Sequence, residues 1–243
     1  MPNVFSRRIK INDRISIIIP TLGQVIDSDG GDAFSYFDCI FPIIATPYDM
    51  MVQLYDNGID YTKITDFDLF CLLFEGIKNA DMSLVFEDLD LSGFNTVINQ
   101  ETREIVLKDS QSDTVIDRVI HSRIADAIRS IVHMERNYKK PGNEAAFKYM
   151  IERARKKQKK MMNQKQDSQL ESAIVALVNN SNFPYNYDTI RDITINQFYL
   201  SLEQISHKIR FDNTMHGYYA GTVKMEDLSQ ADKTWILNLN GGR

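Results

Sequence analysis

The sequence is poor in the residues around which disulfide-rich domains and metal sites are built. Its 243 residues include only two cysteines, four histidines and one tryptophan. Cys39 and Cys71 lie in the apolar stretches FDCIF and LFCLLF, and there is no further cysteine to form a disulfide framework. We expect two reduced, buried thiols in an intracellular protein, although a single disulfide between them is compatible with the sequence.

Long hydrophobic runs are also missing. No run approaches the roughly 20 apolar residues that a membrane-spanning helix needs. The first residues, MPNVFSRRIKIND, lack the apolar core of a signal peptide. We therefore expect a soluble protein without membrane contact.

Catalytic and metal-binding motifs are absent as well. His121, His133, His207 and His216 do not lie at metal-ligand spacing, and neither HExxH nor CxxC occurs. Glycine-rich phosphate loops and GxSxG are missing, and neither cysteine has a histidine near it in sequence. We predict no catalytic residues, no metal and no cofactor, and hence a protein that is not an enzyme.

One stretch imitates a calcium loop. Residues 88–93, DLDLSG, match the first six positions of an EF-hand loop. The twelfth position, which supplies the bidentate glutamate that closes the calcium shell, is Asn99. The stretch is therefore predicted to be a turn that leads into a β-hairpin.

Positive charge is concentrated in one segment. Residues 139–165 contain ten Lys or Arg and two acidic residues, a net charge of +8, whereas the rest of the chain has 18 basic and 31 acidic residues, a net charge of −13. Such a segment suits a connector, a docking surface or a groove for an anionic partner. The candidate residues for an anionic partner are Arg153, Arg155, Lys156, Lys157, Lys159 and Lys160.

Hydrophobic periodicity and capping residues predict most of the elements in residues 1–138. Two β-hairpins are expected, at Ile9–Ile19 and Phe94–Leu107. Helices are expected after Thr21, over 33–45 with a kink or break at Pro42, over 48–56 after Thr46, over 66–74 after Thr65, and from about Thr114 to Tyr138.

The C-terminal part is predicted to be helical. A polar connector over 163–168 precedes a helix over 170–178, a helix from Thr194 to about Tyr218 and a last short helix that begins at Ser229 and carries Trp235. The predicted fold is mainly α with small β-hairpins, in the α+β class. Two helical lobes, 1–138 and 170–243, are joined by a basic connecting helix in 139–169.

The helix after Thr194 carries more aromatic residues than its own core requires. Its buried stripe is predicted to consist of Ile195, Phe198, Leu202, Ile205 and Ile209. Off that stripe lie four candidate partner-binding residues: Tyr199, Phe211, Tyr218 and Tyr219. They either anchor a protein interface or are covered by the first lobe.

Four stretches together resemble one family. They are PTLGQVI, YDMMVQLYDNGIDYTKITDFDLFCLLF, IERARKKQKK and RDITINQFYLSLEQISHKIRFDNTMHGYYAGTV. They resemble tail-region structural proteins of phages and prophages of Gram-positive bacteria, and the chain is similar to a tail assembly chaperone. The resemblance implies a first domain that begins with β structure, in some members a second helical region joined by ribosomal frameshifting, and no catalysis.

The same resemblance implies a function in the host cytoplasm, where such proteins coat the tape-measure protein and recruit tail-tube subunits. We expect those tail proteins as partners, together with possible homo-oligomer formation. Because the whole length is one continuous reading frame, an alternative function is that of a fixed structural component of the virion. A nucleic-acid-binding module that uses the basic helix is another, but few aromatic residues lie among its charges, which disfavours nucleic acid as a partner.

Overall fold

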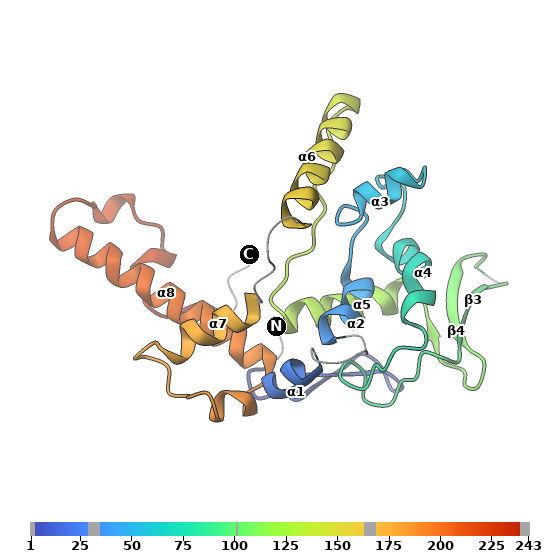
Figure 1. Cartoon of the computed structure of the whole chain (residues 1–243), viewed down its shortest axis with the longest axis horizontal. Helices are drawn as coiled ribbons and strands as arrows, with labels where there is room; N and C mark the ends of the chain where they lie inside the picture. The colour runs from blue at the N-terminus through green and yellow to red at the C-terminus, as the bar shows by residue number, and fades with distance from the viewer. Residues whose placement is uncertain (1–2, 29–34, 101, 163–168, 239–243) are drawn as a thin grey trace.

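The computed structural model describes residues 3–28, 35–100, 102–162 and 169–238 (Figure 1). It confirms a mainly helical α+β fold with two small antiparallel sheets. Helices α2 and α5 lie side by side at the centre of the molecule, and α6 and the far end of α8 project away from it in different directions. The predicted connector over 163–168 lies outside the described residues.

The first hairpin forms as predicted. Strands β1 (Arg8–Lys10) and β2 (Ser16–Ile18) pair antiparallel, with Ile9 opposite Ile17. Asn12 Oδ1 accepts hydrogen bonds from the N–H groups of Arg14 and Ile15 and so closes the turn.

Four helices follow: α1 (Leu22–Asp27), α2 (Tyr36–Ile44), α3 (Met51–Asp56) and α4 (Asp66–Ile77). Capping boxes at Thr21 and Thr65 begin α1 and α4 as predicted. Of the predicted kink or break at Pro42, the break is wrong, because α2 runs through this residue to Ile44. Helix α3 begins later than predicted, since Thr46 bonds to Asp49 and caps a turn that precedes the helix.

The second hairpin is confirmed and gains an unpredicted strand. Strands β3 (Phe94–Ile98) and β4 (Ile105–Asp109) pair antiparallel, and β5 (Val115–Ile116) adds to the β4 edge. The predicted helix start at Thr114 is therefore wrong. The N-cap of α5 (Arg118–Ile131) is Asp117, whose carboxylate accepts the N–H of Ile120.

Helix α5 also ends seven residues before the predicted Tyr138. His133 has a φ of 54°, and the N–H of Met134 donates to the carbonyl of Arg129. This is a helix-ending Schellman arrangement with histidine where glycine is usual. The His133 ring lies between Glu203 Oε1 and Asn196 Oδ1, at 3.0 and 3.1 Å, so tertiary contacts hold the histidine in a left-handed conformation.

The rest of the described chain consists of helices and short helical turns joined by loops. It comprises α6 (Glu144–Met162), α7 (Gln169–Val178), α8 (Ile195–Tyr219) and the short 3₁₀ turns η2 (Thr189–Asp192), η3 (Met225–Asp227) and η4 (Ala231–Lys233). The capping box at Thr194 begins α8 as predicted. The predicted last helix is wrong, because η4 is a single turn and Trp235 lies beyond it.

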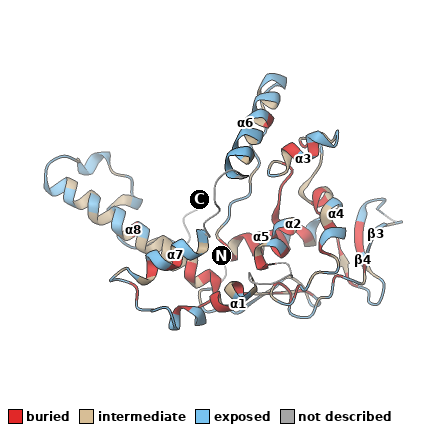
Figure 2. Cartoon of the chain, in the orientation of Figure 1, coloured by how far each residue is buried: buried red, intermediate tan, exposed pale blue. Residues whose placement is uncertain are grey.

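The main core is continuous across the predicted lobes. Buried residues of β2, α1, α2, α4 and α5 pack in one cluster with Ile174 and Leu177 of α7 and with Ile195 and Phe198 of α8. Figure 2 shows that burial is concentrated around α2 and α5, whereas the far end of α8 is exposed. The predicted domain boundaries at residues 138 and 170 thus remain a prediction, although buried residues on either side of them pack together.

Candidate functional site

The distal half of α8, residues 208–219, extends beyond the core. The last buried residue of α8 is His207, and none of residues 208–219 is buried. Tyr219 is 80% exposed and Tyr218 is 39% exposed, and their ring centroids lie 5.5 Å apart. The two tyrosines form an exposed aromatic pair at the end of the helix.

The other two candidate residues on α8 have different surroundings. Tyr199 packs against the main core, with its ring 5.3 Å from Phe198 and 5.9 Å from His133, and burial raises the pKa of its hydroxyl. Phe211 is half-buried. Tyr199 therefore helps to hold α8 on the first lobe, and the structure brings only Tyr218 and Tyr219 together as an exposed pair.

The predicted buried stripe of α8 fades along the helix. Ile195 and Phe198 are fully buried, and Leu202 and Ile205 are half-buried against the core. Ile209 is 46% exposed, so its predicted burial is wrong. This residue lies on the distal half of α8, which projects away from the centre of the molecule (Figure 1).

Helix α6 is held on α3 by its first two turns. Asn143 Oδ1 accepts the N–H of Ala146 at the start of the helix. Phe147 stacks on Tyr61 with the ring centroids 4.9 Å apart and the planes 10° apart. Ile151 is buried in the same small cluster. The apolar contact is limited to this part of the helix, since Met161 at the other end is 45% exposed.

The six candidate cations of α6 divide into two groups. Arg155 forms an ion pair with Asp56 of α3, and its guanidinium carbon lies 5.9 Å from the centre of the Tyr55 ring. The other five are exposed, and no residue in the described ranges forms an ion pair with them: Arg153, Lys156, Lys157, Lys159 and Lys160. The spacing of Arg153, Lys157 and Lys160 places them on one helix face.

The calcium-like stretch forms a turn, as predicted. Asp90 accepts hydrogen bonds from the N–H and the hydroxyl of Ser92, and these bonds lower the pKa of its carboxyl. Among the described residues, no group of three or more His, Cys, Asp or Glu side chains is arranged to hold a metal ion. None of the described helices is both long and apolar enough to cross a membrane.

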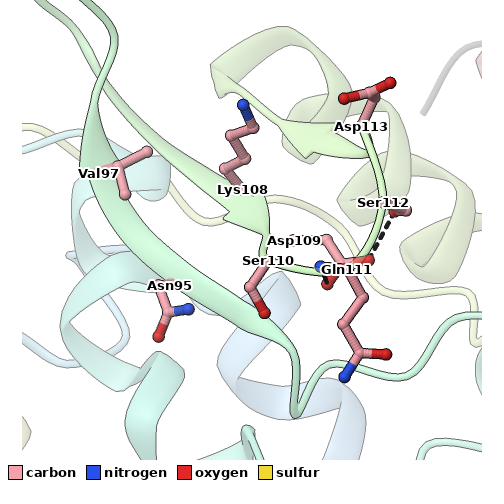
Figure 3. A pocket seen from close by; sticks show the side chains of 8 residues that line it. All are labelled: Asn95, Val97, Lys108, Asp109, Ser110, Gln111, Ser112 and Asp113. Carbon is pink, nitrogen blue, oxygen red and sulfur yellow. Dashed lines mark hydrogen bonds between the residues drawn. The ribbon is translucent and has the colours of Figure 1, made fainter.

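A shallow polar pocket of about 390 Å³ lies beside this turn, between β3 and the loop after β4 (Figure 3). Ser112 donates its hydroxyl hydrogen to Asp109, and this bond is the main reason that the pKa of the Asp109 carboxyl is lowered. Lys108 and Asp113 also line the pocket. Sequence reasoning gave no sign of this pocket, because it depends on the pairing of β3 with β4.

The two cysteines are free thiols, as expected. Cys39 is buried and Cys71 is half-buried. Burial raises the pKa of both thiols, for Cys71 to about 11. Both groups are therefore protonated at neutral pH, the form in which a thiol is a poor nucleophile.

An ionic network missed by the sequence analysis links α4 and α5. Asp66 accepts from Nε and Nη2 of Arg136 at 2.7 and 3.1 Å, and the buried Arg129 places its Nη2 3.4 Å from the same carboxylate. Arg129 also donates to the carbonyl of Ile44 and to Asp126. The network joins residues that are more than 60 positions apart in sequence, which no local pattern can reveal.

These features define a mainly helical α+β protein with an exposed aromatic helix end and an exposed basic helix face. Residues 156–240 match the family model of the YomV second domain. YomV is a Bacillus phage-region protein, and the match is consistent with a phage-derived chain. No curated protein and no solved structure matches the chain.

Proposed function

We propose that the chain is a non-enzymatic, chaperone-like assembly factor of a phage tail that acts in the host cytoplasm. Its partners in this proposal are tape-measure or tail-tube proteins. The main observation in support of this proposal is the exposed pair Tyr218–Tyr219 on the distal half of α8. Large aromatic residues are the side chains that most often anchor protein interfaces.

Two further observations support this proposal. The distal half of α8 lies within the range that matches the YomV second domain, and YomV comes from a phage region. Residues 208–219 also carry a further exposed apolar side chain, Ile209. The expectation of tail proteins as partners rests on the resemblance of the sequence to tail assembly chaperones.

The test is co-purification of the full chain with the tape-measure and tail-tube proteins encoded beside it. We expect Tyr218→Ala and Tyr219→Ala to reduce capture of one of these proteins at least tenfold, because each removes an interface anchor. The melting temperature should change little, because neither tyrosine is buried. Tyr149→Ala is the matched control, since Tyr149 is an exposed tyrosine on α6.

Two results would count against the proposal. One is full capture of both tail proteins by the two variants. The other is a loss of about 3–5 kcal/mol of stability in both, the cost typical of a buried aromatic residue. Tyr199→Ala calibrates this second outcome, because its ring packs on His133 and Phe198.

A nucleic-acid-binding module is the second candidate, favoured by the five exposed cations of α6. Non-specific contacts to phosphates alone give dissociation constants of roughly 10⁻⁴–10⁻⁶ M at physiological salt. We expect affinity in this weak range for both a labelled duplex and a single strand. Submicromolar, sequence-selective binding would favour the nucleic-acid module over the assembly factor.

A further inference from the structure

One face of α8 carries a row of three polar side chains that bind the end of the described chain. Gln204, His207 and Arg210 are spaced by three residues, so they lie on neighbouring turns of the helix. Their partners are residues of the C-terminal segment, residues 231–238. The segment runs back along α8 in the opposite direction, since Arg210 contacts its start and Gln204 contacts its end.

Gln204 binds the main chain of this segment with both ends of its carboxamide. Its Nε2 donates to the carbonyl of Trp235 at 2.7 Å, and its Oε1 accepts the N–H of Leu237 at 2.9 Å. These two groups flank Ile236, and a neighbouring β-strand would offer the same donor and acceptor. Through these two hydrogen bonds Gln204 binds main-chain groups on both sides of Ile236 and no side chain of the segment.

His207 and Arg210 continue the row. His207 is 7% exposed, and its Nε2 lies 2.8 Å from the carbonyl of Thr234. Arg210 Nη2 lies 3.2 Å from His207 Nδ1. Because a guanidinium only donates, Nδ1 accepts and Nε2 carries the hydrogen that binds Thr234. Arg210 Nε also forms an ion pair with Asp232 at 3.3 Å.

The segment itself uses few of its large side chains in this contact. Trp235 is 53% exposed and Ile236 is 56% exposed. Three of the four contacts from α8 are to main-chain atoms of residues 234–237. Gln204 and His207 therefore recognise main-chain groups, and another peptide segment whose main chain follows the same course could make the same three bonds.

An apolar groove of about 530 Å³ adjoins this row. Its lining includes Leu200 and Ile205 of α8, Phe183 and Tyr185 of the loop before α8, and Ile236 and Leu237 of the C-terminal segment. Phe5, which is 82% exposed, also lines it. Although the C-terminal segment occupies the polar row, it leaves this groove open.

We propose that the row Gln204–His207–Arg210 and the adjoining groove form a docking site for an apolar peptide segment of a partner protein. The chain's own residues 234–237 occupy the polar part of the site until the partner replaces them. This site is separate from Tyr218 and Tyr219, and it does not depend on the proposed role in tail assembly.

The chemistry of the partner segment follows from the apolar groove, which the chain's own C-terminal segment leaves open. A partner segment would form the same main-chain bonds with Gln204 and His207. In addition, its apolar side chains would fill the groove, where burial of apolar surface favours binding. The partner therefore gains contacts that the resident segment lacks, which offsets the advantage of a tethered competitor.

The test uses the full chain and a fluorescein-labelled peptide with the sequence of residues 230–238, with Phe in place of Trp235. Trp235 is the only tryptophan in the protein, so its fluorescence anisotropy reports whether the resident segment is held. Leu237→Pro removes the N–H that Gln204 binds. We expect this variant to show lower Trp235 anisotropy and about fivefold tighter peptide binding than the wild type, the factor expected for one lost hydrogen bond.

A second substitution tests the site itself. Gln204→Leu, added to Leu237→Pro, should weaken peptide binding about tenfold because both main-chain bonds of the carboxamide are lost. Gln53→Leu, at an exposed glutamine of α3, is the matched control and should leave binding unchanged.

Three outcomes would overturn the proposal. The first is the absence of saturable binding to the Leu237→Pro variant. The second is binding that Gln204→Leu leaves unchanged. The third is a dimer of the Leu237→Pro variant in analytical ultracentrifugation that the peptide dissociates, because the occupant would then be the C-terminal segment of a second copy.

Discussion

His121 makes the stability of the protein depend on pH in a window that can be stated in advance. The residue His121 is 2% exposed. Its ring stacks on the ring of Phe70, with the centroids 4.6 Å apart and the planes 20° apart. Nε2 lies 3.0 Å from the carbonyl of Ile43. Burial lowers the pKa of the ring from 6.5 to about 4, although the bond to Ile43 and the charge of Asp66 oppose the shift.

The sign of the effect follows from this lowered pKa. As the pH falls, the unfolded chain binds a proton near pH 6.5, before the folded chain does near pH 4. His121 therefore has no effect above about pH 7, and stability is lost between pH 6.5 and 4. The loss is about 2 kcal/mol at pH 5 and about 3 kcal/mol at pH 4, from 1.36 kcal/mol for each unit of pKa difference.

Urea denaturation at pH 7 and pH 5 measures this loss, with His121→Gln as the comparison. Glutamine retains an N–H donor for Ile43 but does not titrate. The wild type should lose about 2 kcal/mol more than the variant between the two pH values. Equal losses in both proteins would refute the reasoning, because the pH dependence would then come from other groups.

Two other predictions follow from buried groups and one from the calcium-like turn. Asp66→Asn should lower the free energy of unfolding by about 2–3 kcal/mol in urea denaturation, because the buried Arg129 loses a charge partner. The control Asp126→Asn removes an exposed partner of the same arginine and should lower it by less than about 1 kcal/mol. Tyr61→Phe should raise the unfolding free energy by about 1 kcal/mol, because the buried hydroxyl has no hydrogen-bond partner among the described residues. Calcium should leave the melting temperature unchanged relative to chelator, and a shift equivalent to about 2.7 kcal/mol at a hundredfold excess over Kd would contradict this.

Helix starts were the features most accessible from the sequence. The capping boxes at Thr21, Thr65 and Thr194 all form, because a Ser or Thr followed three residues later by an acidic residue or Gln satisfies orphan N–H groups locally. Ser35 caps α2 in the same way but was missed, because the predicted helix began earlier, in a part that lies outside the described residues. Local chemistry is sufficient where the hydrogen bonds themselves are local.

Helix ends and the last residues could not be predicted in this way. The end of α5 depends on His133, whose partners Asn196 and Glu203 lie more than 60 residues away. The course of the main chain at Trp235 depends on Gln204, which lies 31 residues earlier in the chain. The candidate partner-binding residues show the same difference. The exposed tyrosines were predicted from helical spacing, whereas the burial of Tyr199 depends on the position of the first lobe.

The range that matches the YomV second domain is physically joined to the part of the chain outside it. The N–H of Leu22 donates to the carbonyl of Ile193 at 2.8 Å, and the N–H of Ile195 donates to the carbonyl of Pro20 at 2.9 Å. These bonds set the first turns of α1 and α8 side by side, and Ile195 and Phe198 are fully buried there. Because buried backbone groups require partners, the first lobe fixes the base of α8 and thereby the direction in which its distal half projects. The position of any surface on α8 is therefore a property of the full chain.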